Sequence, residues 1–493
     1  MTTNSNGTGR SGVVGPSAVR RDDASMPDLS GLPVGFTWGT ATAAFQIEGD
    51  AEHRGDSIWD EFCREPGRIL DRSDGRVACD HVNRYRQDVG LLEDLGVDAY
   101  RFSVSWPRVV PGGRGPVSGQ GLDFYDRLVD ALMEAGIHPW ITLYHWDLPI
   151  SLQAEGGWAS RSVVDPFVEY ALAVHSALGD RVRYWTTLNE PWCSAWLGYG
   201  NGQHAPGVRD HTAGARAAHH LLLAHGSATR AMRSQAPADH QFGVVHNIAP
   251  AYAVPGAPEA VAEAAYVVDG FRNRWWLDSM FTAAYPRDTL ELLAPALDGF
   301  ILDGDLTEIA APIDFMGVNY YSDLVFDGLG ESRPHAEPHP MPIAVTVVPP
   351  GPDETTMGWD VTPDGLREIL VRVGKAYPQA PWLVVTENGS AYLDDFEAVA
   401  ADGYLEDPRR EAYLLRHLEA LAAAVREGAD VRGYFVWSML DNFEWALGYT
   451  QRFGLVSVDF QSQQRRPKRS FDTYRQVIAY QRRLAVQGTP ATV

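Results

Sequence analysis

Eight short stretches of β-forming residues, separated by segments with helical periodicity, constrain the fold of this chain more than any other sequence feature. The predicted strands are 36–45, 98–105, 138–144, 184–190, 241–247, 314–321, 382–387 and 431–437. Helices are predicted between the earlier strands, near 83–95, 122–132, 163–178 and 213–232. Strands that alternate with helices imply a parallel sheet with right-handed crossovers. Eight such units predict an α/β fold, a single (β/α)8 TIM barrel with long loops at its C-terminal face.

Polar and aromatic residues gather where the predicted strands end. In barrels of this type the working residues lie at the C-terminal ends of the strands. The residues predicted at those ends are Gln46, His145, Asn189, Glu190, Tyr321, Glu387 and Trp437. The sequence therefore predicts one functional site at this face of the barrel.

Two of these strand ends carry a carboxylate. Thr187-Leu188-Asn189-Glu190-Pro191 ends a β-rich run at a proline, and Thr386-Glu387-Asn388-Gly389 follows an apolar run far downstream. Either motif alone is a weak signal. Together they supply what glycoside hydrolysis requires, which is one carboxyl group to protonate the leaving oxygen and another to attack or stabilise the anomeric carbon.

Charge and cysteine content exclude several classes of function. The chain has 64 acidic and 41 basic residues, and the net charge of -23 argues against nucleic acid as a partner. Cys63, Cys79 and Cys193 are too few and too scattered for a disulfide framework or a zinc site, and His219, His220 and His225 lack metal-ligand spacing. We therefore expect a reducing, cytoplasmic location, no metal and no cofactor.

The ends of the chain differ from its middle. Residues 1–31 are rich in Gly, Ser, Asn and Asp and contain neither a signal-peptide core nor a membrane span, so no membrane partner is expected. We predict a flexible leader over 1–31, the catalytic barrel over 32–480 and a tail over 481–493. The Pro- and Gly-rich segment 322–359 shows little periodicity, so it is either a functional lid or binding loop, or a surface excursion.

The chain resembles the family 1 glycoside hydrolases, which are retaining β-glucosidases and their relatives. The resemblance covers residues from about 32 to 474. The matching runs are Gln46-Ile47-Glu48-Gly49, Tyr100-Arg101-Phe102-Ser103, Leu143-Tyr144-His145-Trp146, Thr187-Leu188-Asn189-Glu190-Pro191, Val318-Asn319-Tyr320-Tyr321, Val385-Thr386-Glu387-Asn388-Gly389, Trp437-Ser438-Met439-Leu440-Asp441-Asn442-Phe443-Glu444-Trp445 and Arg452-Phe453-Gly454-Leu455. A minor departure is Ala283, where the family commonly has glycine.

The resemblance implies that Glu387 is the nucleophile and Glu190 the acid/base. Chemistry supports this division, because Arg101 and Tyr321, expected at neighbouring strand ends, can hold Glu387 as a carboxylate. Glu190 needs a proton at neutral pH, and repulsion from an ionised Glu387 favours that protonated form until the glycosyl-enzyme forms. By the same resemblance, the amide of Asn189 contacts the sugar 2-hydroxyl.

Sugar recognition also follows from the resemblance. It assigns the first ring to Gln46, His145, Asn319, Tyr321, Glu444 and Trp445, with Trp437 as stacking floor, Phe453 as wall, and Trp192 and Trp359 on the leaving-group side. A single histidine such as His145 is more often a core residue than a ligand contact, and Trp437 alone would be assigned to the core. Their places at matched strand ends beside two carboxylates favour the binding role.

The predicted function is a retaining β-glucosidase that acts on terminal β-D-glucosyl and related β-hexosyl residues. Its expected substrates are small-molecule β-glucosides or cello-oligosaccharides, and the oligomeric state is left open. A transglycosidase that uses the same site and a non-catalytic sugar-binding barrel remain alternatives. Glu444 would repel a phosphate on the sugar, so a neutral sugar is expected.

Overall fold

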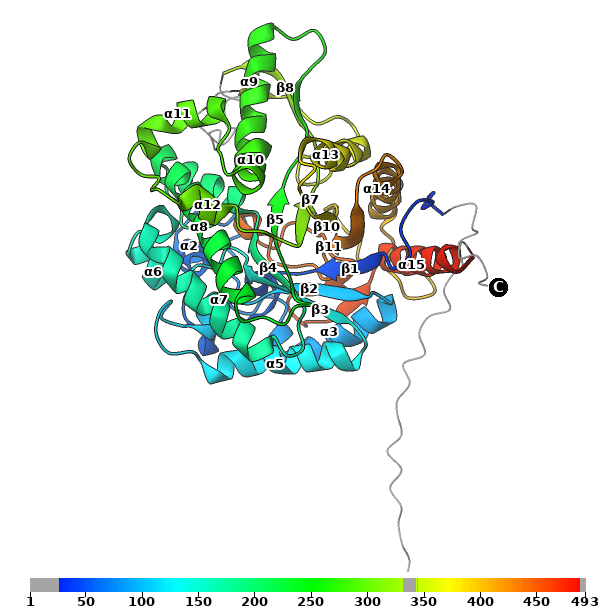
Figure 1. The fold of residues 1–493 in the computed structure, drawn as a ribbon. Helices are drawn as coiled ribbons and strands as arrows, with labels where there is room; N and C mark the ends of the chain where they lie inside the picture. The colour runs from blue at the N-terminus through cyan, green and yellow to red at the C-terminus, as the bar shows by residue number, and fades with distance from the viewer. Residues whose placement is uncertain (1–25, 331–342, 344, 488–493) are drawn as a thin grey trace, which may run out of the picture.

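The computed structural model describes residues 26–330, 343 and 345–487, and its centre is a closed barrel of parallel strands (Figure 1). Around the barrel the strands follow the order β1, β2, β3, β4, β5, β7, β10 and β11, and β11 pairs with β1. Their bounds are Thr37–Ala41 (β1), Ala99–Ser103 (β2), His138–Tyr144 (β3), Tyr184–Asn189 (β4), Gln241–Asn247 (β5), Phe315–Asn319 (β7), Trp382–Asn388 (β10) and Val431–Trp437 (β11). The predicted (β/α)8 barrel is confirmed.

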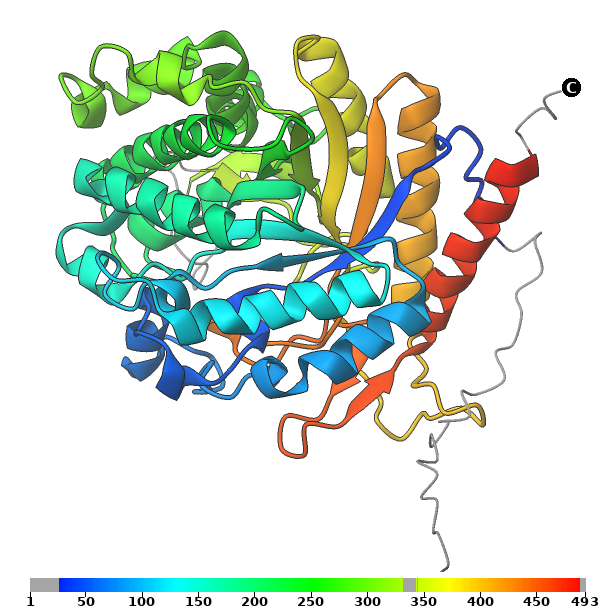
Figure 2. The ribbon, with the colours of Figure 1, turned by 60° about the horizontal axis from the view of Figure 1, so that its bottom comes forward.

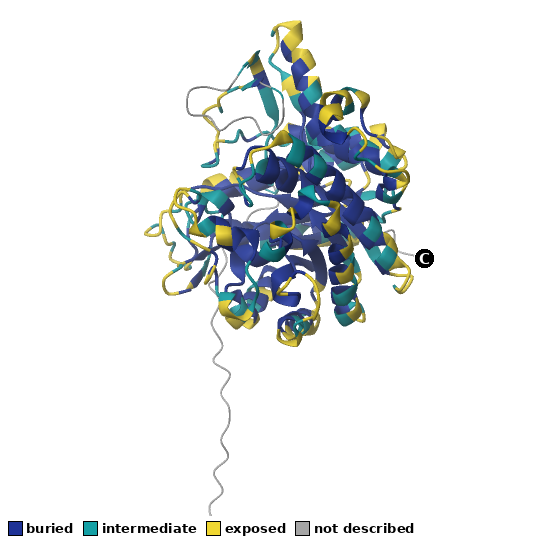
Figure 3. Cartoon of the chain, turned by 90° about the vertical axis from the view of Figure 1, so that its left-hand side faces the viewer, coloured by how far each residue is buried: buried dark blue, intermediate teal, exposed yellow. Residues whose placement is uncertain are grey.

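Helices surround the barrel and turn their apolar faces toward it (Figures 2 and 3). The bounds of the helices after the first strand are Ile58–Arg64 (α2), His81–Leu95 (α3), Trp106–Val109 (α4), Gly119–Glu134 (α5), Ile150–Ala154 (α6), Val164–Leu178 (α7), His211–Arg233 (α8), Glu259–Asp269 (α9), Trp275–Thr282 (α10), Arg287–Leu297 (α11), Asp305–Ile309 (α12), Pro363–Ala376 (α13), Pro408–Arg426 (α14) and Arg469–Gln487 (α15). Shorter turns are η2 (Ala51–His53), η3 (Gly157–Ala159), η4 (Arg161–Val163) and η7 (Trp445–Leu447), and the π-helical segments are η5 (Cys193–Gly200) and η6 (Gly270–Arg274).

The first strand is shorter than the predicted 36–45. It ends at Ala41, and Ala44–Ile47 forms the short helix α1. The hydroxyl of Ser103 accepts a hydrogen bond from the Ala44 backbone N–H at 2.7 Å, which helps the chain to turn away from the ladder. Gln46 therefore lies on a helix that follows the strand, still at the C-terminal mouth.

An apolar layer fills the N-terminal half of the barrel. Trp140 on β3 stacks on Tyr184 at 4.2 Å and meets the edges of Phe315 and Phe435 at 5.0 and 5.2 Å between ring centroids. Gly39 on β1 leaves room for this layer, because a Cβ there would lie 2.3 Å from the Phe435 ring. The charged residues of the barrel interior lie beyond this layer, toward the C-terminal mouth.

The segment 322–359 contains strands, so the expectation of a structureless loop is wrong for its described part. Leu324–Leu329 (β8) pairs in parallel with Ala251–Ala253 (β6) and antiparallel with Val345–Val347 (β9). Phe326 on β8 is buried, and this anchors the small sheet. Figure 1 shows β8 rising beside α9 above the barrel. Residues 331–342 and 344 lie outside the described residues.

Both predicted chain boundaries fall within packed structure. Leu29 is buried in the main core, ahead of the predicted boundary at residue 32. Helix α15 continues to Gln487, and Gln481 accepts a hydrogen bond from Trp38 Nε1 at 3.3 Å. A two-stranded ribbon of Val456–Val458 (β12) and Arg465–Pro467 (β13) precedes this helix. Within the described residues, no helix is long and apolar enough to cross a bilayer.

Candidate active site

The two predicted catalytic carboxylates lie at irregular strand ends. The pairing of β4 with β5 shifts register between Thr186 and Asn189, just before Glu190. The pairing of β10 with β7 shifts between Val385 and Glu387. Glu190 itself has a φ of 46°, a left-handed conformation that is strained for a residue with a side chain. Such irregularities redirect side chains at the mouth of a barrel.

Glu387 is held by the two donors that the sequence predicted. Arg101 Nη1 donates to Oε1 at 2.6 Å, and the Tyr321 hydroxyl donates to Oε2 at 2.7 Å. Both carboxylate oxygens are therefore oriented, and the side chain is nearly inaccessible to solvent. Arg101 also donates from Nη2 to Asn189 Oδ1 at 2.6 Å, which links the two catalytic strand ends.

Burial raises the pKa of Glu387 to about 7, against the opposing charge of Arg101, and the nearby Glu190 carboxyl adds to the rise. Arg101 and Tyr321 favour the carboxylate form of Glu387, as expected from the sequence, but the effect of burial is larger. The nucleophilic form is reached near neutral pH.

Glu190 has a different set of donors. Asn319 Nδ2 donates to Oε1 at 2.6 Å, and the Cys193 thiol donates to Oε2 at 3.1 Å. The Asn319 amide is oriented in turn by Thr386, whose hydroxyl donates to Asn319 Oδ1 at 2.7 Å. The two carboxyl groups thus sit in separate hydrogen-bond environments, as two different chemical roles require.

The protonation of His145 follows from its neighbour Asn189. Asn189 Oδ1 accepts hydrogen bonds from Arg101 and Asn319, so the other amide atom must be the nitrogen. That Nδ2 donates to His145 Nε2 at 3.0 Å. Burial lowers the pKa of His145 far below its usual range, so the ring is neutral and carries its proton on Nδ1. Nδ1 has no hydrogen-bond partner within the described part of the chain, which leaves a donor for a ligand hydroxyl.

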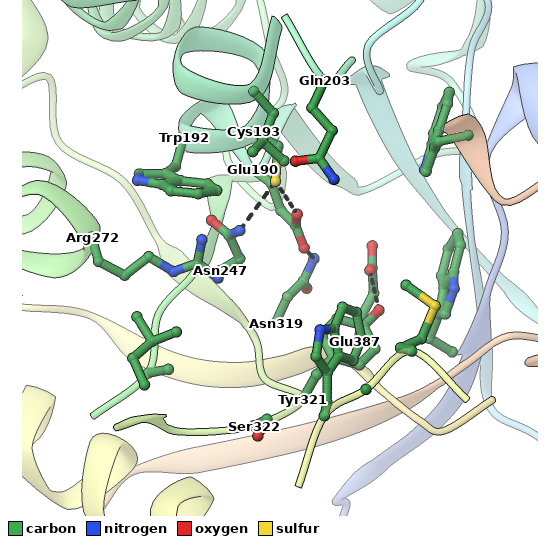
Figure 4. A pocket seen from close by; sticks show the side chains of 18 of the residues that line it. Glu190, Trp192, Cys193, Gln203, Asn247, Arg272, Asn319, Tyr321, Ser322 and Glu387 are labelled. Carbon is green, nitrogen blue, oxygen red and sulfur yellow. Dashed lines mark hydrogen bonds between the residues drawn. The ribbon is translucent and has the colours of Figure 1, made fainter. Parts of the chain in front are cut away.

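These groups open onto a cavity of about 430 Å³ (Figure 4). Among the predicted site residues, those that line it are His145, Glu190, Trp192, Asn319, Tyr321, Trp359, Glu387, Trp437, Glu444, Trp445 and Phe453. Gln46, Arg101 and Asn189 are buried behind this lining. Arg101 and Asn189 contact Glu387 and His145, which do line the cavity.

Glu444 and Trp445 close one end of the cavity. Burial raises the pKa of Glu444 to about 8, and the charges of Glu387 and Glu190 add to the rise. Glu444 is therefore mainly protonated at neutral pH, so it can donate as well as accept hydrogen bonds. Its Oε2 and the Oε1 of Gln46 are buried with no hydrogen-bond partner among the described residues. Both atoms are available to a polyhydroxylated ligand.

Aromatic rings form the floor and walls. Trp437 stacks with His145 at 5.9 Å, and Phe453 and Trp359 pack beside it with Tyr321 in one apolar cluster. Trp192 lies across the cavity beyond Glu190 (Figure 4). Such faces suit the C–H surfaces of sugar rings and of aryl groups.

Several lining residues were not found from the sequence, namely Trp146, Cys193, Gln203, His204, Asn247, Arg272 and Asp323. Asn247 could have been found, because it ends the predicted strand 241–247 at the catalytic face. In the sequence, Cys193 indicates only the redox compartment. Arg272 lies in the π-helical segment between two helices, where the strand-end rule gives no signal.

The structure also places the histidines of α8. His219 contacts Tyr285 and Asp305, His220 contacts the Trp158 carbonyl, and His225 contacts the Thr187 hydroxyl. Within residues 26–330, 343 and 345–487, no group of three or more His, Cys, Asp or Glu side chains could hold a metal ion.

Comparison with known proteins agrees with this geometry. The sequence profile of glycosyl hydrolase family 1 matches residues 29–483. A bifunctional β-D-glucosidase/β-D-fucosidase of Bifidobacterium breve is 47% identical over 461 residues, which are 91% of this chain and 98% of the relative. The crystal structure of the psychrophilic β-glucosidase BglU of Micrococcus antarcticus superposes with a TM-score of 0.84 at 46% identity, covering 91% of this chain and 97% of the other. The β-glucosidase of Thermotoga maritima in complex with glucoimidazole gives a TM-score of 0.84 at 42% identity, covering 91% and 99%.

Proposed function

The chain belongs to glycosyl hydrolase family 1, and from this premise we propose that it is a retaining β-glucosidase that removes terminal non-reducing β-D-glucosyl and related β-hexosyl residues. The relatives named above are β-glucosidases, and one is also named a β-fucosidase. We propose small β-glucosides or cello-oligosaccharides as substrates. The observation that carries this proposal is the pair Glu190 and Glu387, which face one cavity with different donors.

In the first half of the reaction, Glu387 attacks the anomeric carbon while Glu190 gives its proton to the glycosidic oxygen. The Arg101 and Tyr321 donors fix Glu387 in position for this attack. The covalent bond to the sugar removes the negative charge of Glu387 beside Glu190. In the second half, Glu190 takes a proton from water, which attacks the same carbon and restores the original configuration.

Three of the proposed sugar contacts use the unpartnered polar atoms described above. His145 Nδ1–H, Gln46 Oε1 and Glu444 Oε2 are assigned to hydroxyls of the first ring, and Asn189 to the 2-hydroxyl. Trp437 forms the floor under this ring. Trp192 and Trp359 remain proposed contacts of the leaving group.

The test of the two roles uses the variants Glu387→Ala and Glu190→Ala. Glu387→Ala should abolish turnover, whereas Glu190→Ala should still form the glycosyl-enzyme from an aryl glucoside whose leaving group needs no proton. Azide should then rescue Glu190→Ala with a β-glucosyl azide, and Glu387→Ala with the α anomer. The opposite anomers would reverse the assignment. NMR of the first-formed glucose should show the β anomer.

Neither alternative function is favoured by an observation. A non-catalytic sugar-binding barrel would not need two carboxyl groups that are each oriented by two donors. A transglycosidase would share every contact of this site, and chromatography of the products with and without an added alcohol separates it from a hydrolase. The cytoplasmic location stays a prediction to be tested by cell fractionation. Light scattering would determine the oligomeric state, for which the sequence makes no prediction.

A further inference from the structure

The cavity has a second polar region, on the side of Glu190 away from Glu387 (Figure 4). Two π-helical segments build it, because Trp192 precedes η5 and Arg272 lies within η6. Figure 4 shows Arg272 reaching toward Trp192 and Asn247, and all three residues line the cavity. The wide turns of π-helices often occur at functional sites.

Arg272 forms no ion pair in the part of the chain that the structure describes. Its guanidinium carbon lies 4.2 Å from the centroid of the Trp192 ring, and its Nε is buried with no hydrogen-bond partner. Burial lowers the pKa of Arg272, because desolvation disfavours the charged form, and Cys193 and Glu190 oppose this fall. The guanidinium stays charged at any working pH.

Two arginines near Arg272 form ion pairs with acidic residues, which Arg272 does not do within the described residues. Arg274, two residues further along, pairs with Asp269 at 3.0 Å and with Asp288 at 2.6 Å. Arg372 also pairs with Asp269, at 2.6 Å. The acidic residues of this region are thus used by other cations, and Arg272 stands alone beside the cavity.

Asp323 and Asp360, the acidic side chains of the described lining besides Glu190, Glu387 and Glu444, already have donors. Asp323 accepts hydrogen bonds from the hydroxyls of Tyr320 and Tyr252 at 2.8 and 3.0 Å. Asp360 accepts one from the backbone N–H of Gly351 at 2.6 Å. A buried charge without a partner is costly, so it is expected to find its partner in the bound ligand.

Resting on the function proposed above, we propose that this region is a leaving-group subsite for aromatic carboxylates, in which Arg272 binds the carboxylate and sets the preference for an anionic leaving group. A planar guanidinium binds a carboxylate through two parallel N–H···O hydrogen bonds. The aromatic part of the leaving group would lie between Trp192 and Trp359, both of which line the cavity. The substrate class is therefore a β-glucoside of a phenolic acid, such as a hydroxybenzoate.

The experiment compares two pairs of aryl β-glucosides. The 3- and 4-carboxyphenyl β-glucosides carry the anion, and the 3- and 4-carbamoylphenyl β-glucosides are neutral and nearly identical in shape. At pH 7 the wild-type kcat/KM for at least one carboxylate should exceed that for its carboxamide by about tenfold. Because this ratio is taken within one enzyme, a loss of active protein cancels out.

The variants assign the preference to Arg272. Arg272→Gln should reduce the ratio to about one, and Arg272→Lys, which keeps the charge but not the planar pair of donors, should give an intermediate ratio. Arg287→Gln removes the same charge from an exposed helix position, where the side chain is 93% accessible, and should leave the ratio unchanged. If Arg272→Gln does not fold, the ratios for Arg272→Lys and for the wild type still decide whether Arg272 sets the preference for a carboxylate.

A wild-type ratio of one or less for both pairs, or a ratio that Arg272→Gln leaves unchanged, would overturn the subsite. Turnover of p-nitrophenyl β-glucoside by the wild-type enzyme separates this result from failure of the proposed function. An enzyme that cleaves the nitrophenyl glucoside without preferring either carboxylate is a β-glucosidase without this subsite. An enzyme that cleaves none of these glucosides contradicts the function itself.

Discussion

The Cys193 thiol donates a hydrogen bond to Glu190 Oε2 at 3.1 Å, while its sulfur accepts one from Asn247 Nδ2 at 3.2 Å. The amide thus fixes the direction of the thiol, and the thiol fixes one oxygen of the proposed acid/base. Cys193 therefore positions the carboxyl group of Glu190, although it does not touch the sugar.

We predict that Cys193→Ala weakens proton transfer by Glu190. Without the thiol, one carboxyl oxygen loses the donor that fixes its direction. kcat/KM should fall several-fold for a glucoside whose leaving group needs a proton, and much less for p-nitrophenyl β-glucoside, because a thiol is a weak donor. Cys193→Ser keeps a donor at the same place and should keep the wild-type ratio of the two kcat/KM values. An unchanged ratio in Cys193→Ala would contradict this role.

A second prediction concerns the acid limb and Glu387. Since burial raises the pKa of Glu387 to about 7, kcat/KM should fall as pH decreases through about 7 and the nucleophile becomes protonated. Tyr321→Phe removes a hydroxyl that favours the charged form, so the acid limb should move to higher pH and kcat/KM should fall. Tyr449→Phe, which loses a hydroxyl bonded to the Asp74 carbonyl, is the control. Equal profiles in both variants would show that Tyr321 does not act on Glu387.

The sequence was sufficient for the barrel and for the residues at its strand ends, because strand periodicity and parallel topology together decide which side chains meet at the mouth. It was not sufficient for the residues that loops and π-helical turns bring in. Arg272 and Cys193 reach the cavity only through the path of η6 and η5. The raised pKa values of Glu387 and Glu444 depend on burial, which no local pattern reveals.

A third prediction follows from the buried histidines, which should make the fold sensitive to acid. Burial lowers the pKa of each of these side chains in the fold, to about 4 for His175 and His220 and to about 3 for His204, His225, His246 and His417. The unfolded chain takes up these protons near pH 6.5, so their stabilising contribution is present above that pH and is lost as the pH falls toward 4. The melting temperature should therefore drop steeply between pH 6.5 and 4.

The variant His417→Gln removes one of these titrating side chains and so tests its contribution. His417 is fully buried against Tyr413, and each such histidine adds about 1.4 kcal/mol per pH unit to the slope of the unfolding free energy in that range. The variant is expected to be less stable at pH 7 but to lose stability less steeply on acidification. Denaturant unfolding at several pH values measures both slopes, and parallel slopes would contradict the assignment.

A fourth prediction concerns Ala283, which stands where the family commonly has glycine. Ala283 ends α10 with a φ of 53°, in the left-handed region that a side chain disfavours. Ala283→Gly should therefore stabilise the fold by about 1 kcal/mol, and raise the melting temperature by roughly 1 °C in a chain of this size. Ala135 ends α5 with a φ of -79°, so Ala135→Gly should lower the melting temperature. A fall in both variants would show that the left-handed conformation is not the cause.

The last prediction is that the sugar is not phosphorylated, and that discrimination against a 6-phosphate increases with pH. Glu444 was expected from the sequence to repel a phosphate, but burial raises the pKa of Glu444 to about 8. At pH 7 it is mainly neutral, so rejection of the phosphate rests there on the lack of a cation. Among the described lining residues, the single arginine is Arg272, on the side of Glu190 away from Glu387 (Figure 4), and no lysine is present. As pH rises through 8, Glu444 ionises and its charge adds repulsion of the phosphate.

The test is the ratio of kcat/KM for p-nitrophenyl β-glucoside to kcat/KM for its 6-phosphate. This ratio should exceed one at pH 7 and be larger at pH 9. The increase would come from Glu444, because the phosphate is already a dianion at pH 7. Glu444→Gln should remove the increase. Equal or better turnover of the phosphate at pH 7 would overturn both the neutral substrate and the role of Glu444.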